Sequence, residues 1–193
     1  LSVVSMDRPN GFAGATMLQT TLVGCAAPVG AIGQEVGLAF NMAGDRLYIV
    51  LPDMARVDVY NRKADGTVAG PLQTVQVGMR PTDIVISEFD FGDGLGFREW
   101  GLVTSRGEGS ERPKIRRFRL GDPTDSFDFD FSSGSGPVSV SAHPRLSNPN
   151  GPIPAFVADA GSPEIQIIDL KRMRSLSIRK TISVPRRVTV QGQ

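Results

Sequence analysis

Short apolar runs alternate with turn-forming residues along most of this chain, and the pattern predicts strands. Between residues 36 and 77, four stretches carry Val, Ile, Leu, Tyr and Phe in unbroken runs or at every second position, which favours β-structure. Gly44-Asp45 and Asp65-Gly66 supply turns between these stretches. We therefore expect antiparallel strands over residues 36–41, 47–51, 57–60 and 72–77.

The same order of four strands recurs along the chain. The first strand of each set begins near Leu38, Ile84, Val138 and Val188, which gives spacings of 46, 54 and 50 residues. Units of this size with four strands are typical of β-propeller blades. No stretch has sustained helical periodicity, and one turn of helix is expected at Lys171–Leu176, inside a hairpin connection. The second set is expected at 83–87, 100–104, 114–120 and 127–131, the third at 138–141, 155–159, 164–168 and 179–184, and residues 187–190 begin a fourth.

Residues 1–24 repeat the pattern of residues 56–78. Both stretches read as strand, Asx-Gly turn and strand, and both close on Leu-Gln-Thr, two variable residues and Val-Gly. An immunoglobulin-like sandwich also has short strands, but it does not repeat such an ending at a fixed place in successive units. The sequence thus predicts an all-β fold, a β-propeller of four-stranded antiparallel blades that is incomplete in this chain. About three full blades are expected at 35–78, 82–134 and 137–185, the outer strands of a partial blade at 1–24, and the first strand of a further blade at 186–193.

Two loops are longer than the blade pattern requires. Asp90–Gly96 lengthens the first connection of the second blade, and Arg145–Pro154 lengthens that of the third. Loops at blade ends commonly carry the specificity of propellers, so these insertions are candidate recognition elements.

Composition and charge exclude several classes of site. The net charge is +1, which gives no global field toward nucleic acid or a membrane surface. No apolar run is long enough to span a bilayer as a helix. A single Cys excludes an internal disulfide framework, and a single His makes any histidine-based triad or metal site depend on His143. Leu22-Val-Gly-Cys25 matches a lipobox, but polar residues precede it where a signal peptide is apolar, so Cys25 is expected in a linker.

Five residues are candidates for binding a ligand or a partner. Arg80, Arg186 and Arg187 precede or begin inner strands at equivalent places, and converging arginines can hold a carboxylate or phosphate. Asp83 lies near the same channel mouth, and His143 follows an inner strand. Each also has an ordinary structural interpretation, as the partner of a neighbouring blade's charge or as a turn residue. The sequence predicts no catalytic residue, no metal ligand and no cofactor.

Two charged clusters favour structural interpretations. Arg117 and Arg119 share one face of a strand, and the adjacent strand offers Asp128 and Asp130, so we expect a cross-strand charge ladder. Phe127, Phe129 and Phe131 alternate with these acids and should pack between blades. Residues 171–187 carry seven cations and no acid, which predicts a solvated outer hairpin or a surface for an acidic partner. No aromatic residues are interleaved for stacking on single-stranded nucleic acid.

Residues 35–86 resemble the YVTN and lactonase-like propellers. The resemblance rests on Gly44-Asp-Arg-Leu-Tyr-Ile49, on Val57-Asp-Val-Tyr60 and on Val77-Gly-Met-Arg-Pro-Thr-Asp-Ile84. Asn41-Met-Ala-Gly44 departs from the usual Pro-Asp-Gly turn, and the third blade matches the layout but lacks the Tyr. The resemblance implies a propeller, often in the bacterial envelope or secreted, and it carries no catalytic assignment.

Three functions remain open on the sequence alone. The first is a non-catalytic binding or assembly module of a bacterial envelope or secreted complex, with other chains or missing blades of the same protein as partners. The second is a lactonase-like hydrolase whose active site is completed by blades outside this segment. The third is a propeller that supports a redox subunit, for which no haem-attachment motif is present. The first is favoured because the segment shows no nucleophile–base pair.

Overall fold

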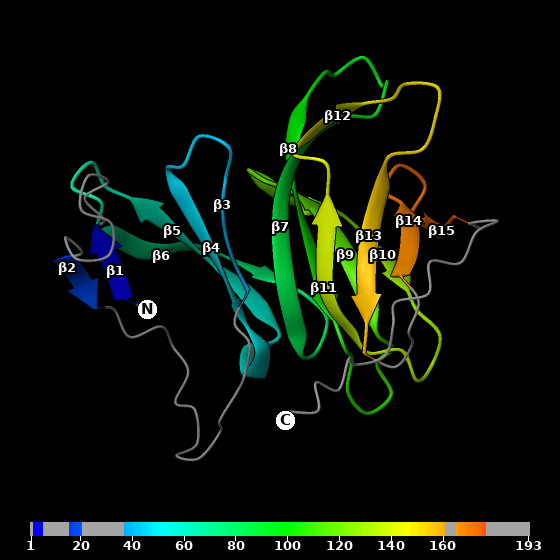
Figure 1. Cartoon of the computed structure of the whole chain (residues 1–193), viewed down its shortest axis with the longest axis horizontal. Coiled ribbons are helices and arrows are strands. Elements are labelled where there is room, and N and C mark those ends of the chain that lie inside the picture. The colour runs from blue at the N-terminus through cyan, green and yellow to red at the C-terminus, as the bar shows by residue number, and fades with distance from the viewer. Residues whose placement is uncertain (1, 6–15, 21–36, 161–164, 177–193) are drawn as a thin grey trace, which may run out of the picture.

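The computed structural model describes residues 37–160 and 165–176, and the backbone of 2–5 and 16–20. The described part is all-β, with three larger sheets standing next to one another and a separate two-stranded sheet (Figure 1). That small sheet pairs β1 (Ser2–Ser5) with β2 (Thr16–Thr20), where the sequence repeat predicted two strands. Cys25, Arg186, Arg187 and the strands expected at 179–184 and 187–190 lie outside the described residues.

Each larger sheet is built from strands that follow one another along the chain. The first sheet has the order β3-β4-β5-β6, the second β10-β9-β8-β7-β12 and the third β11-β13-β14-β15. Their bounds are β3 Leu38–Phe40, β4 Arg46–Leu51, β5 Arg56–Arg62, β6 Val68–Gln76, β7 Pro81–Asp90, β8 Arg98–Ser105, β9 Lys114–Arg119, β10 Asp122–Asp130, β11 Pro137–Ala142, β12 Arg145–Ser147, β13 Pro154–Asp159, β14 Ile165–Asp169 and β15 Arg174–Ser175. A single 3-10 turn, η2 (Pro52–Met54), connects β4 to β5.

Apolar side chains join the three sheets through two cores. The core between the first and second sheets includes Val50 and Val57 on one side and Ile84 and Val103 on the other. The core between the second and third sheets includes Leu102 and Trp100 packed with Val157 and Ile168. Alternation along each strand places these residues on one face of a sheet, and burying them is worth about 1.5–3 kcal/mol for each large side chain.

The inner strands β3, β7 and β11 lie side by side, with the other strands of each sheet extending outward (Figure 1). In the second and third sheets, the inner strand (β7 and β11, respectively) begins with the same irregularity in its pairing. The pairing of β7 with β8 shifts between Pro81 and Asp83, and the pairing of β11 with β13 shifts between Pro137 and Ser139. The paired residues at the start of β7 and β11 therefore correspond, with Pro81 matching Pro137.

Two strands depart from the expected pattern. β12 lies within the predicted Arg145–Pro154 insertion and pairs in parallel with β7, which makes the second sheet five-stranded. β15 pairs with β14 where the sequence predicted a helical turn, because Lys171–Met173 already reverse the chain after Asp169. No helix in the described residues has the length and apolar character needed to cross a membrane.

The predicted charge ladder forms with different residues. Arg116, which directly precedes the two arginines named from the sequence, donates to both oxygens of Asp128 at 2.6 and 2.7 Å. Arg119 instead pairs with Asp122 and Asp125 of the same hairpin, and Arg117 donates to the carbonyl of Leu170, which follows β14 of the third sheet. The strand register explains the error, since Asp128 lies directly opposite Arg116. Of the three phenylalanines, Phe131 is buried in the core beside the third sheet, whereas Phe127 is half exposed.

Candidate functional site

Arg80 and Asp83 are held by neighbouring groups near one end of the second sheet. The guanidinium of Arg80 pairs with Glu108 at 3.0 Å, and its backbone has a left-handed φ of 50°. Asp83 Oδ2 accepts hydrogen bonds from Ser139 Oγ at 2.8 Å and from Val140 N at 3.0 Å. The Asp83 carboxylate therefore ties β7 to β11.

His143 lies at the other end of the inner strands. Its Nδ1 accepts a hydrogen bond from Arg145 N at 3.1 Å, so the ring closes the turn between β11 and β12. The carbonyl of Pro144 accepts from Glu88 N, which is five residues along β7 from Asp83. At a strand rise of about 3.4 Å per residue, His143 and Asp83 are about 17 Å apart. The structure thus does not bring these two candidates together.

The two predicted insertions fold against each other around this histidine turn. β12 pairs in register with the end of β7, from Arg145 opposite Glu88 to Ser147 opposite Asp90. Ser147 Oγ donates to Asp90 Oδ2 at 2.9 Å, and Arg145 pairs with Glu88 at 3.1 Å. We call residues 88–98 together with 143–153 the insertion platform. The sequence identified both loops, but it gave no signal that they would meet.

A glycine makes the close approach of the two loops possible. Gly92 has a φ of +72°, and a Cβ atom there would lie 2.6 Å from the Cα of Pro149. The 91–97 loop is further held by an ion pair of Asp93 with Arg98 and by the Asp90 carboxylate, which accepts from Gly92 N at 2.9 Å. Burial alone would raise the pKa of Asp93, but hydrogen bonds from Leu95 N and Arg98 hold it below its usual value.

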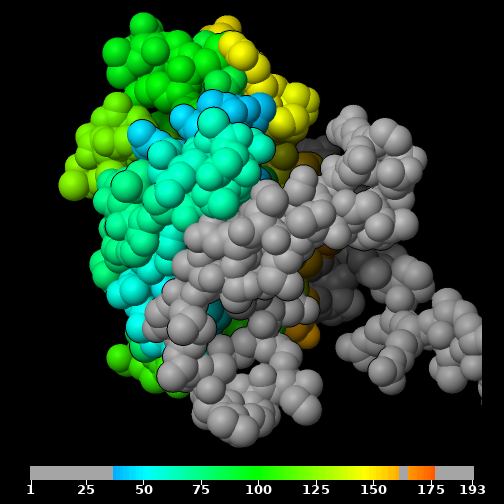
Figure 2. Space-filling view, turned by 90° about the vertical axis from the view of Figure 1, so that its left-hand side faces the viewer, coloured from blue at the N-terminus to red at the C-terminus, as the bar shows by residue number. Residues whose placement is uncertain are grey.

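The insertion platform exposes apolar side chains at its surface. Leu95 is 68% exposed at the tip of its loop, and Phe97 is 40% exposed beneath the guanidinium of Arg145, whose Cζ lies 4.3 Å from the ring centroid. Met42, in the turn between β3 and β4, is half exposed, and its N–H donates to Glu99 at the base of the platform. From the side of the first sheet, this turn (blue) lies at the same end as the green and yellow platform loops (Figure 2).

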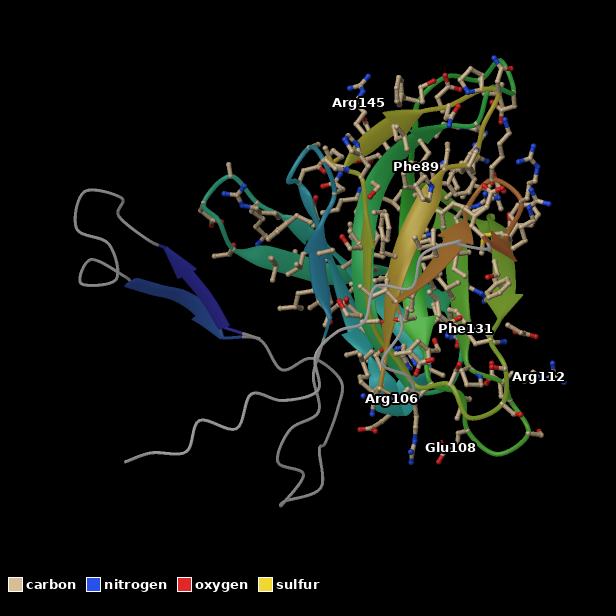
Figure 3. The ribbon with its side chains drawn as sticks, turned by 45° about the vertical axis from the view of Figure 1, so that its right-hand side comes forward. Phe89, Arg106, Glu108, Arg112, Phe131 and Arg145 are labelled. Carbon is tan, nitrogen blue, oxygen red and sulfur yellow. The ribbon has the colours of Figure 1, made fainter. Side chains whose placement is uncertain are left out.

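The opposite end of the second sheet carries a charged loop. Residues 106–113 connect β8 to β9, and Arg106, Glu108 and Arg112 lie far from Arg145 (Figure 3). Glu111 organises this loop by accepting from Met79 N at 3.1 Å and pairing with Lys114 at 2.9 Å. Burial would raise the pKa of Glu111, but these two donors outweigh it and keep the pKa below its usual value.

Arg117 occupies the core between the second and third sheets. It is 5% exposed, and its Cζ lies 4.6 Å from the ring centroids of Phe91, Trp100 and Phe127. A guanidinium NH donates to the carbonyl of Leu170 in the third sheet. Burial lowers the pKa of Arg117 to about 10, which leaves it charged at neutral pH. The aromatic rings shield the cation from solvent, so Arg117 has a structural role in holding the second and third sheets together.

The basic stretch is partly committed to contacts within the chain. Lys171 Nζ donates to the carbonyl of Pro149 in the insertion platform, and Arg172 and Arg174 pair with the buried Asp169. The other cations of residues 171–187 lie outside the described residues, so a surface for an acidic partner there stays a prediction. Within the part of the chain that the structure describes, no three His, Cys, Asp or Glu side chains gather as metal ligands would.

Comparison with known proteins shows similarity of fold. No family model and no curated protein matches the chain. A functionally unknown protein from Desulfotomaculum acetoxidans aligns with a TM-score of 0.56 at 13% identity, over 92% of this chain and 48% of that one. A second solved structure, described as "a putative 6-phosphogluconolactonase" from Bacteroides fragilis, aligns with a TM-score of 0.48 at 21% identity, over 91% of this chain and 43% of that one. The chain spans less than half the length of either structure, and membership of the YVTN or lactonase-like family stays a prediction.

Proposed function

We propose that this chain is part of a β-propeller that acts as a non-catalytic binding and assembly module in a bacterial envelope or secreted complex. The propeller interpretation is supported by three consecutive sheets that stack face to face around neighbouring inner strands. Each sheet would be one blade, with 35–78, 82–134 and 137–185 as the blade boundaries and partial blades at 1–24 and 186–193.

One observation carries the binding role: the insertion platform joins two loops that are far apart in sequence into one surface with apolar tips. Leu95 and Phe97 stand on backbone that is fixed by ion pairs and by the β7–β12 pairing. An exposed apolar group on a rigid support binds a partner with little loss of conformational entropy. By contrast, Arg80 and Asp83 are engaged in contacts within the chain.

A site-specific photo-crosslinker tests the binding role. Benzoylphenylalanine placed at Leu95 in the full chain should give a discrete crosslinked product with a protein of a bacterial envelope extract. The matched control is the same probe at Leu72, which is 62% exposed on β6, away from the platform. An identical crosslinking pattern at both positions would contradict a binding platform.

A direct assay tests whether this segment carries hydrolase activity by itself. Purified chain is incubated with a δ-lactone and hydrolysis is followed by acid release, with His143→Ala as the comparison. We expect the rate to equal that of buffer for both proteins. Turnover by the wild-type chain would favour the lactonase-like hydrolase over the assembly module.

A further inference from the structure

One face of the second sheet carries buried N–H and O–H groups that lack an acceptor. Ser87 Oγ, Arg98 Nε, Trp100 Nε1 and Arg117 Nε have no hydrogen-bond partner in the part of the chain that the structure describes. Ser87 is 0%, Trp100 2% and Arg117 5% exposed. Buried polar groups in folded proteins almost always have a partner, so a group of exceptions indicates a bound water or ion. We call these four residues the donor cluster.

The strand register brings the donor cluster together around Trp100. Arg98 and Trp100 are two residues apart on β8 and therefore project from the same face of the sheet. Trp100 lies directly opposite Ser87 of β7, and residues in such pairs have Cβ atoms about 4.5–5.5 Å apart. The Cζ of Arg117 lies 4.6 Å from the Trp100 ring centroid, and the Cζ of Arg98 lies 5.5 Å from it.

The donor cluster carries positive charge that the chain neutralises only in part. Arg98 pairs with Asp93, whereas Arg117 donates to the uncharged carbonyl of Leu170 and forms no ion pair within the described residues. The pKa of Arg117 is lowered to about 10 by burial, and the positive charge of Arg98 adds to this lowering. An anion beside both guanidinium groups would therefore relieve an unfavourable interaction.

The chemistry of the four groups selects the kind of occupant. Guanidinium and indole N–H groups donate hydrogen bonds and cannot accept them, so only Ser87 could accept one. A water molecule in their midst would leave one of its own O–H groups without a partner, and a cation would be repelled. The face is covered by the third sheet, since Trp100 packs with Val157 and Ile168, so the occupant must be small.

We propose that the donor cluster binds a single small monovalent anion, chloride in ordinary solution, through Ser87 Oγ, Trp100 Nε1 and Arg117 Nε. The side chain of Arg98, which is 16% exposed, connects this site with the solvent. The site is separate from the insertion platform and does not depend on the binding role proposed above.

Trp100 is the single tryptophan of the chain, so its fluorescence reports on this site. Iodide is a heavy analogue of chloride that quenches indole fluorescence on contact, and it is added to the full chain at constant ionic strength. Because Trp100 is 2% exposed, quenchers that act by random collision should have little effect. We expect saturable quenching by iodide, reversal by chloride, and no quenching by caesium ions.

Two arginine variants make a matched pair for this assay. Arg117→Met and Arg112→Met each remove one positive charge, but Arg112 is exposed in the 106–113 loop. We expect Arg112→Met to keep the saturable quenching and Arg117→Met to lose it. Ser87→Ala retains both buried guanidinium groups and removes one donor, so the half-saturating iodide concentration should rise about threefold to tenfold. This small substitution carries the test if Arg117→Met does not fold.

Thermal unfolding gives a second measurement of the same site. An anion that binds only the folded chain raises its stability in proportion to the logarithm of site occupancy by free ligand. Replacing gluconate, which is too large for the site, by chloride at constant ionic strength should raise the melting temperature of the wild type. The rise should be absent in Arg117→Met and unchanged in Arg112→Met.

Several outcomes would overturn the proposal. Iodide quenching that is linear in concentration, or that caesium ions reproduce, would show collision rather than binding. No quenching would show that the buried donors hold no exchangeable anion. Saturable quenching that persists unchanged in both Ser87→Ala and Arg117→Met would show that the anion binds elsewhere, as would an equal chloride effect on the melting temperatures of the two arginine variants.

Discussion

The carboxylate of Asp83 accepts two hydrogen bonds from the next inner strand, from Ser139 Oγ at 2.8 Å and from Val140 N at 3.0 Å. Its other oxygen accepts from Ile84 N at 2.8 Å. A residue that the sequence offered as a ligand therefore connects two sheets through one carboxylate oxygen, while the other oxygen accepts from its own strand.

Replacing Asp83 should weaken the junction of the second and third sheets. Hydrogen bonds to a charged group contribute about 1.5–3 kcal/mol, so we expect Asp83→Ala to lower the free energy of unfolding by about that amount. Ser139→Ala should cost less, about 0.5–1.5 kcal/mol, because the bond from Val140 remains. Urea unfolding of the two variants measures the difference, and an equal loss for both would contradict the role given to Asp83.

Arg117 should be replaceable by an apolar side chain of similar length but not by a small one. Arg117→Ala leaves a cavity among Phe91, Trp100 and Phe127, for which a cost of about 2–5 kcal/mol is expected. Arg117→Met fills most of that volume and removes a buried charge, so its cost should be at least about 1 kcal/mol smaller. Denaturant unfolding of both variants measures the two losses of unfolding free energy. A larger loss for Arg117→Met than for Arg117→Ala would contradict the view that Arg117 stabilises the protein mainly by filling space.

The same residue predicts a pH dependence. Burial lowers the folded-state pKa of Arg117 to about 10, well below the ordinary value of an arginine, so above pH 10 the unfolded chain holds this proton more tightly than the folded chain. The wild type should therefore gain stability relative to Arg117→Met as the pH rises from 9 to 11. Comparing the two proteins at each pH cancels the titration of all other groups. A constant difference across this range would contradict the depressed pKa.

Glu111 predicts a pH dependence in the acidic range. Because its folded-state pKa lies below 4.5, its contribution is present above that value and is lost as the pH falls through the folded pKa. We expect Glu111→Gln to be less stable than the wild type at neutral pH by less than about 1 kcal/mol, since the group is partly exposed. The gap should narrow as the pH falls through the folded-state pKa of Glu111, as thermal unfolding at several pH values would show.

Gly92 and Gly94 provide a matched pair for testing the insertion platform. Both have positive φ, but only Gly92 faces another loop, where a Cβ would lie 2.6 Å from Pro149 Cα. Gly94→Ala should cost about 1–2 kcal/mol from backbone strain alone. Gly92→Ala should cost more and should also speed amide exchange in β12. Equal effects of the two substitutions on β12 exchange would show that the loops are independent.

Much of the strand pattern was predictable because it depends on local alternation. The unbroken run Leu47–Leu51 and the alternating Val57–Tyr60 became β4 and β5, and both lie against cores on two sides. The charge ladder was predicted as a type of contact, but its residues were wrong by one position, because a sequence does not show which residue of β9 lies opposite Asp128.

The candidate site was less predictable for the same reason. Sequence position placed Arg80 and His143 among possible ligand groups, whereas the structure uses Arg80 in a loop ion pair and His143 in a turn. The association of Gly92 with Pro149 joins residues that are distant along the chain, and no local pattern encodes such a contact.

By itself the sequence determined the all-β fold, the order of the strands and the two insertions, because hydrophobic alternation and turn chemistry act over a few neighbouring residues. The tertiary structure alone decided which partners the charged residues take, that Arg117 is enclosed by three aromatic rings, and that the insertions meet in one platform. Those outcomes depend on register and on the packing of whole sheets, which bring together groups more than fifty residues apart.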